Sequence, residues 1–122
     1  MAAQLQVTWI RNTENTWCGL HAVNLAHNHL NNVSGVYLIW HAGPTPRYVR
    51  VGQGNIRDRL THHRTDTAIN AYRNLGLLVT WASVPDNHLD GVEAYLANQC
   101  NPLVGERFPN VVPISVNLPS RE

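Results

Sequence analysis

The order of hydrophobic and polar residues along the chain predicts a small fold of strands and helices. Residues 35–40 form an almost continuous apolar run, which is typical of a strand buried on both faces. Residues 47–52 alternate between apolar and polar side chains, and residues 77–84 are again apolar. These three segments predict a three-stranded antiparallel sheet. A further short strand is expected at residues 5–10.

Four other segments have the spacing of helices. In the second, Asn55 can cap the helix, and Ile56 and Leu60 form its core face. Gly76 ends the third segment, and Pro102 blocks continuation of the fourth. The expected helices span residues 17–30, 55–64, 67–75 and about 86–99, and residues 104–122 are expected to pack as an extended segment. The sequence therefore predicts an α+β domain with a small three-stranded antiparallel sheet flanked by helices.

Length and composition favour one folded domain over residues 1–122. The chain has 122 residues, of which 43% are hydrophobic, and no apolar run approaches the ~20 residues that span a bilayer. No signal peptide is evident at the start, so a cytoplasmic location and no membrane partner are expected. Cys18 and Cys100 are far apart, which argues against a cysteine-based zinc site and favours free thiols.

The positive charge is concentrated in one part of the chain. The net charge is only +1, and all nine basic residues are arginines. Between residues 47 and 64, Asp58 is the only acid among five arginines, so this segment can attract phosphate. A solvated arginine-rich hairpin and helix is the alternative interpretation. The five arginines are Arg47, Arg50, Arg57, Arg59 and Arg64.

Glu93 is the clearest candidate for chemistry. It lies four residues after Leu89 and three before Leu96, on or beside the apolar stripe of its expected helix. A carboxylate there costs several kcal/mol unless it is paired or bound to a metal ion. Its hard oxygen atoms suit Mg²⁺ or Mn²⁺, which often take one or two carboxylates. The alternative is a boundary glutamate that is paired with an arginine such as Arg59.

Arg59 and His63 are four residues apart and share one face of their helix. The arginine fork suits phosphate, and the histidine can bind phosphate or shuttle a proton. Tyr37 is either a core aromatic or a hydroxyl at the sheet edge that contacts an attacking water. Gly52 and Gly54 would let the backbone approach a phosphate at the helix N-terminus, where Asn55 lies. Arg57 and Arg64 point elsewhere and fit contacts with a DNA backbone.

The order and spacing of these motifs resemble the GIY-YIG nuclease domain, over about residues 34–110, with residues 1–33 as an N-terminal extension. The motifs are Gly35-Val36-Tyr37, Arg50-Val51-Gly52, the helix 55–60 with Arg59, His63 one turn later, Glu93, and Pro102 nine residues after Glu93. The resemblance implies a metal-dependent endonuclease that hydrolyses DNA phosphodiester bonds. It also implies that Glu93 holds Mg²⁺ or Mn²⁺ and that Arg59 stabilises the phosphate in the transition state. Tyr37 would act as, or assist, the general base on water, and His63 would support the phosphate or the tyrosine.

Two positions depart from the family pattern. Arg50 replaces the tyrosine of the second motif, and Gly105 stands where many members have asparagine. Arg50 can donate to phosphate but cannot readily act as a base at neutral pH. Tyr48 is expected on the same strand face as Arg50, but its distance to Gly52 does not fit a simple substitute.

Three functions therefore compete. The first is an active endonuclease, which would need lax specificity, dimerisation or a separate DNA-recognition partner. The second is a catalytically degenerate domain that binds nucleic acid or a protein partner without cleavage, and Arg50 motivates it. The third is a thiol hydrolase, suggested only by the order of Cys18 and His21, which also fits one apolar helix.

Overall fold

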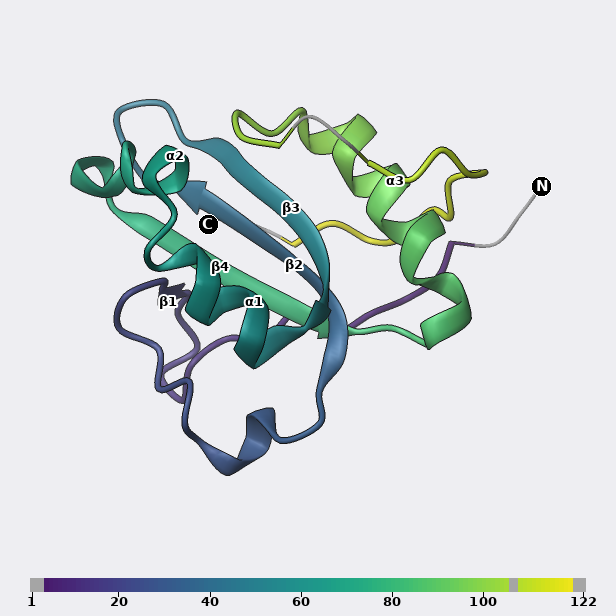
Figure 1. Ribbon diagram of the computed structural model, residues 1–122, viewed down its shortest axis with the longest axis horizontal. Helices are drawn as coiled ribbons and strands as arrows, with labels where there is room; N and C mark the ends of the chain where they lie inside the picture. The colour runs from purple at the N-terminus through teal and green to yellow at the C-terminus, as the bar shows by residue number, and fades with distance from the viewer. Residues whose placement is uncertain (1–3, 106–107, 120–122) are drawn as a thin grey trace.

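The computed structural model describes residues 4–105 and 108–119. Its sheet has four strands in the order β1-β4-β2-β3, and each neighbouring pair is antiparallel (Figure 1). The three predicted strands are confirmed, and the fourth, β1, is a two-residue strand at the opposite edge from β3. The strands are β1 (Cys18–Gly19), β2 (Ser34–His41), β3 (Arg47–Asn55) and β4 (Leu77–Ser83).

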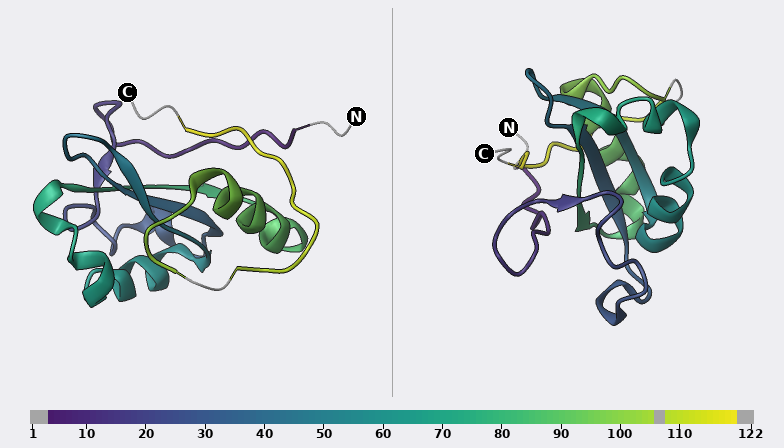
Figure 2. Two further views of the ribbon diagram at one scale, coloured as in Figure 1. Left: turned by 90° about the horizontal axis from the view of Figure 1, so that it is seen from above. Right: turned by 90° about the vertical axis from the view of Figure 1, so that its left-hand side faces the viewer.

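Helices cover both faces of this sheet, so the α+β class is confirmed (Figures 1 and 2). On one face, α1 and α2 pack against the odd-numbered residues of β2, Tyr37 and Ile39. On the other face, α3 packs against the even-numbered residues of β2. The helices are α1 (Ile56–His63), α2 (Thr67–Asn70) and α3 (Leu89–Cys100), and short 3₁₀ turns are η1 (Asn28–Leu30), η2 (Arg73–Leu75) and η3 (Asp86–His88).

A β-bulge interrupts the alternation predicted for residues 47–52. Ile39 pairs with Arg50, whereas Trp40 pairs with Tyr48, so Val49 is an extra residue in β3. The bulge turns Tyr48 to the α3 face, where it packs with Trp40, and leaves Arg50 on the α1 face beside Ile39. The prediction that Tyr48 and Arg50 share a face is therefore wrong, because the extra residue reverses the alternation.

The predicted helix at residues 17–30 is also wrong. Cys18 and Gly19 pair with β4, and the chain then runs as turns whose Leu20, Leu25 and Leu30 enter the α1-side core. Side chains of α1 and of its C-cap residue donate hydrogen bonds to backbone carbonyls that a helix would have bonded internally. Arg64 donates to the carbonyls of residues 20 and 23, and Arg57 donates to those of residues 25 and 27.

Two further predicted elements have less regular structure than expected. The expected strand at residues 5–10 contains a single parallel bridge, between Leu5 and Val116, and the C-terminal segment runs beside it. The expected helix at 67–75 is divided into α2 and η2, where the Asn70 amide donates to the carbonyls of residues 64 and 66. No helix within the described residues is long and apolar enough to cross a membrane.

Replacing Arg64 by methionine is expected to lower the free energy of unfolding by about 2 kcal/mol, because hydrogen bonds from a charged donor to two loop carbonyls are lost. Urea unfolding measures the change. Arg73→Met is the matched control, since Arg73 is exposed. Equal stability of the two variants would show that the arginine does not hold the loop.

Candidate active site

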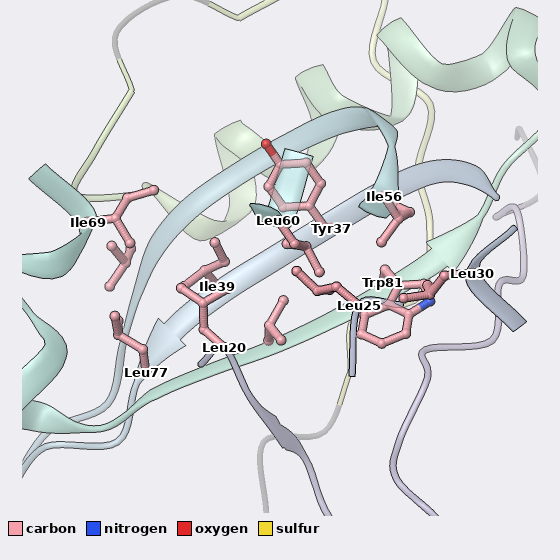
Figure 3. Packing of buried hydrophobic residues seen from close by; sticks show 12 residues of the cluster. Leu20, Leu25, Leu30, Tyr37, Ile39, Ile56, Leu60, Ile69, Leu77 and Trp81 are labelled. Carbon is pink, nitrogen blue, oxygen red and sulfur yellow. The ribbon is translucent and has the colours of Figure 1, made fainter. Parts of the chain in front are cut away.

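A buried tyrosine–histidine pair lies between β2 and α1. The hydroxyl of Tyr37 is 2.5 Å from Nε2 of His63, and the two side chains are 0% and 2% exposed. Figure 3 shows the Tyr37 ring among the apolar side chains of this core, with its hydroxyl pointing away from them. The sequence predicted both residues as site candidates, and the structure places them in direct contact. Of the two interpretations of Tyr37, the structure shows the core aromatic, whose hydroxyl is bonded to His63.

Gly52 and Gly54 leave room for side chains of this site. A Cβ at Gly52 would overlap the hydroxyl of Tyr37, which lies across the strand from it. A Cβ at Gly54, which has a φ of +126°, would lie 3.4 Å from Cγ of Arg59. The sequence predicted that these glycines allow a close approach of phosphate, whereas the structure fills the space beside them with Tyr37 and Arg59.

His63 is held neutral by its surroundings. Burial is the largest cause that lowers its pKa to about 4, and the charges of Arg50, Arg59 and His62 lower it further. Its Nδ1 is buried and has no hydrogen-bond partner among the described residues. In one tautomer Nε2 accepts the proton of the Tyr37 hydroxyl, and in the other it donates to the hydroxyl oxygen. In the first tautomer the imidazole is oriented to take a proton from Tyr37.

Two arginines whose charges act on this pair have side-chain donors without hydrogen-bond partners among the described residues. The Nε atoms of Arg50 and Arg59 are buried, and neither has a hydrogen-bond partner within the described part of the chain. Arg59 comes from α1 one turn before His63, and the bulge brings Arg50 to the same face of the sheet. Buried guanidinium donors without partners are expensive in a folded protein and suit an anionic ligand.

Glu93 lies on α3, on the other face of the sheet, close enough to Arg50 and Arg59 for their charges to affect its pKa. Gln53 of β3 donates to its Oε1 at 3.3 Å and also to Oδ1 of Asp90 at 2.6 Å. Burial raises the pKa of Glu93 and Asp90 adds to the rise, while the hydrogen bond from Gln53 and the charges of Arg50 and Arg59 oppose it. The hydrogen bond to Glu93 therefore comes from Gln53, and the two arginines act on it electrostatically.

The donor set of this site fits a hard divalent cation with few protein ligands. Glu93 and Asp90 are three residues apart on α3, so their carboxylates lie on the same side of the helix. Mg²⁺ often takes one or two carboxylates and keeps its remaining waters. No group of three or more His, Cys, Asp or Glu residues that could enclose a metal ion occurs among the residues that the structure describes. Any cation here would be held mainly by Glu93 and water.

The remaining predicted residues have other surroundings. Asn55 caps α1 by accepting a hydrogen bond from the backbone of Asp58 at 3.1 Å. Arg47 is exposed at the start of β3, opposite His41. Arg57 and Arg64 use their Nε and Nη2 atoms to bind the loop before β2, so the structure gives both a stabilising role.

Sequence reasoning missed Gln53 and Asp90. Asp90 could have been found from its spacing of three residues before Glu93 on the same helix. Gln53 carries no such signal, because only the packing of α3 against β3 brings it to these carboxylates.

Cys18 lies in a different part of the molecule. It lines a pocket of about 420 Å³ beside β1 and Trp81, and none of the residues of the Tyr37 site line that pocket. Burial raises the pKa of the Cys18 thiol, which disfavours the nucleophilic thiolate. Cys18 and His21 do not share a helix, so the apolar helix expected for them is wrong.

Comparisons of the chain with protein-family models, with curated proteins and with solved structures found no match.

The neutral state of His63 predicts a pH-dependent stability. The unfolded chain binds a proton at this residue below about pH 6.5, whereas the folded chain binds it only near pH 4. Between these values, falling pH should therefore destabilise the wild type relative to His63→Gln, by on the order of 3 kcal/mol in total. Denaturant unfolding at a series of pH values measures this difference. A difference that does not vary with pH would contradict the neutral assignment.

The raised pKa of Glu93 predicts that stability changes with pH in the opposite direction. Because its pKa is raised, the folded carboxyl keeps its proton where the unfolded one has lost it, and stability falls as the pH rises through the folded pKa. Glu93→Gln should therefore raise the thermal midpoint at pH 7, with a gain that shrinks towards pH 4. Asp86→Asn, which removes an exposed carboxylate, is the control. A lower midpoint for Glu93→Gln at pH 7 would show that the charge is stabilising.

Proposed function

We propose that the chain is a metal-dependent endonuclease that hydrolyses DNA phosphodiester bonds, as its resemblance to GIY-YIG nucleases implies. The observation that carries this proposal is the buried pair of Tyr37 and His63, with Arg59 one turn before His63 and Glu93 close enough for the charge of Arg59 to affect its pKa. These residues come from β2, α1 and α3, and each was singled out from the sequence for the same chemistry. Ordinary packing does not require two buried arginine Nε atoms without partners.

The tyrosine–histidine pair supplies a route for the proton of the attacking water. Tyr37 is 0% exposed in the free protein, so binding of the phosphate would have to open a path for the attacking water to its hydroxyl. As the water oxygen bonds to phosphorus, its proton would then move to the hydroxyl oxygen of Tyr37, and the hydroxyl proton would move to Nε2 of His63. The bond between phosphorus and the leaving oxygen then breaks, and solvent protonates the leaving oxygen. A bound phosphate would offset the charges of the arginines, which raises the pKa of His63 and makes it a better base.

The charged residues supply the electrostatic part of the mechanism. The Arg59 guanidinium would bind the phosphate oxygens and stabilise the negative charge that develops on them. A divalent cation at Glu93 would act as a Lewis acid on the same phosphate. Gln53, whose amide nitrogen also donates to Asp90, would hold the Glu93 carboxylate in position.

A second function is favoured by Arg50. In a degenerate domain, this arginine would bind a nucleic-acid phosphate while the tyrosine that it replaces no longer assists catalysis. Such a domain would bind DNA, or a protein partner, without cleavage. Where DNA is the partner, sequence selection would come from a second copy of the chain or from a separate recognition protein.

The endonuclease proposal predicts that the wild type nicks supercoiled plasmid with Mg²⁺ or Mn²⁺. Glu93→Ala and Arg59→Ala should each lower the nicking rate by at least about a hundredfold, because a cation ligand or a transition-state contact is lost. Asp86→Ala and Arg73→Ala, which remove exposed charges, should leave the rate unchanged. Absence of cleavage by the wild type, with salt-sensitive DNA binding, would favour the degenerate domain instead.

A further inference from the structure

The two departures from the GIY-YIG pattern meet in space. Arg50 and Gly105 are far apart in the sequence, but a Cβ at Gly105 would overlap Nη1 of Arg50. The same Cβ would lie 3.2 Å from Cζ of Arg50 and 3.2 Å from Cζ of Phe108. The guanidinium of Arg50 therefore occupies the space that any side chain at position 105 would fill.

Backbone hydrogen bonds fix this arrangement. The amide of Leu103 donates to the carbonyl of Tyr48 at 3.1 Å, and the amide of Val104 donates to that of Val49 at 2.8 Å. The segment after α3 thus binds β3 at its bulge, immediately before Gly105. Gly105 has a φ of +107°, a left-handed conformation that side chains rarely adopt. The two hydrogen bonds to β3 therefore place Gly105 beside Arg50.

The bulge places Arg50 on the face of the sheet that carries Tyr37, and the glycine leaves room for its guanidinium. Arg50 lies on the face that carries Tyr37, and its charge lowers the pKa of His63 and opposes the rise in the pKa of Glu93. Its Nε is buried without a partner among the described residues, as is the Nε of Arg59. The positive charges of Arg50 and Arg59 both act on His63, and a bound anion would offset them.

We propose that Arg50 is a second phosphate-binding arginine, which holds a backbone phosphate of DNA together with Arg59, and that Gly105 admits its guanidinium to the site. This inference rests on the proposed function for the identity of the ligand. At the position of the family's tyrosine, the guanidinium of Arg50 would then bind phosphate, where the family has a hydroxyl. Arg50 then requires a glycine at position 105, because a side chain there would overlap its guanidinium.

The test is binding of a short fluorescein-labelled DNA duplex in EDTA, measured by anisotropy over a series of salt concentrations. Arg50→Gln should weaken binding roughly tenfold and reduce the salt slope by about one, because one phosphate contact is lost. Gly105→Ala should produce the same two changes although it removes no charge. Gly76→Ala is the matched control, since Gly76 also has a positive φ, of +82°, and its Cβ would meet only Ala42, at 3.8 Å.

The double variant Arg50→Gln/Gly105→Ala should bind no more weakly than Arg50→Gln alone, because both substitutions remove the same contact. Gly105→Ala binding as tightly as Gly76→Ala, or additive losses in the double variant, would overturn the proposal. If Gly105→Ala does not fold, the salt slope of Arg50→Gln decides, and an unchanged slope overturns the proposal. The predicted binding pattern without any nicking would overturn the endonuclease function while supporting the arginine pair.

Discussion

The buried hydrogen bond between Tyr37 and His63 is the contact on which the arrangement of the site depends. It joins the central strand β2 to the C-terminal end of α1, at 2.5 Å and almost without solvent exposure. The tyrosine hydroxyl can lie across β3 only because residue 52 has no side chain. Once the pair is formed, α1 is oriented so that Arg59, one turn before His63, lies against Gly54 and faces the same edge of the sheet.

The charged and titratable groups around this pair lower the stability of the free protein. Burial disfavours the ionised form of Glu93 and the protonated form of His63, and it leaves the Nε atoms of Arg50 and Arg59 without partners among the described residues. A site that binds a phosphate and a cation would satisfy both arginines and the carboxylate at once. The unfavourable terms of the free protein are therefore those that a charged ligand would remove, which is a common compromise between stability and function.

The sequence predicted most of the fold because its strongest signals are local. The apolar run of β2, the cap at Asn55 and the glycine at 76 each indicate an element boundary or a burial pattern that depends on neighbouring residues alone. The segment 17–30 was misread because its leucines have helical spacing, while the hydrogen bonds that decide its conformation come from Arg57 and Arg64, more than 25 residues away. The bulge at Val49 has no sequence signal, and it reversed the faces assigned to Tyr48 and Arg50.

The basic segment shows why charge alone could not identify the candidate site. Five arginines between residues 47 and 64 suggested one phosphate-binding patch. Helix geometry, however, places the arginines of α1 and its C-cap on two different sides of the helix. Arg57 and Arg64 are seven residues apart and share the side of α1 that meets the loop before β2. Arg59 lies on the other side, with His63 one turn later. The arginines whose buried Nε atoms lack a partner in the described structure are therefore Arg59 and Arg50, which is on β3. A charge cluster becomes a candidate site only where the fold leaves such donors unused, and here that place coincides with the tyrosine, the histidine and the carboxylate.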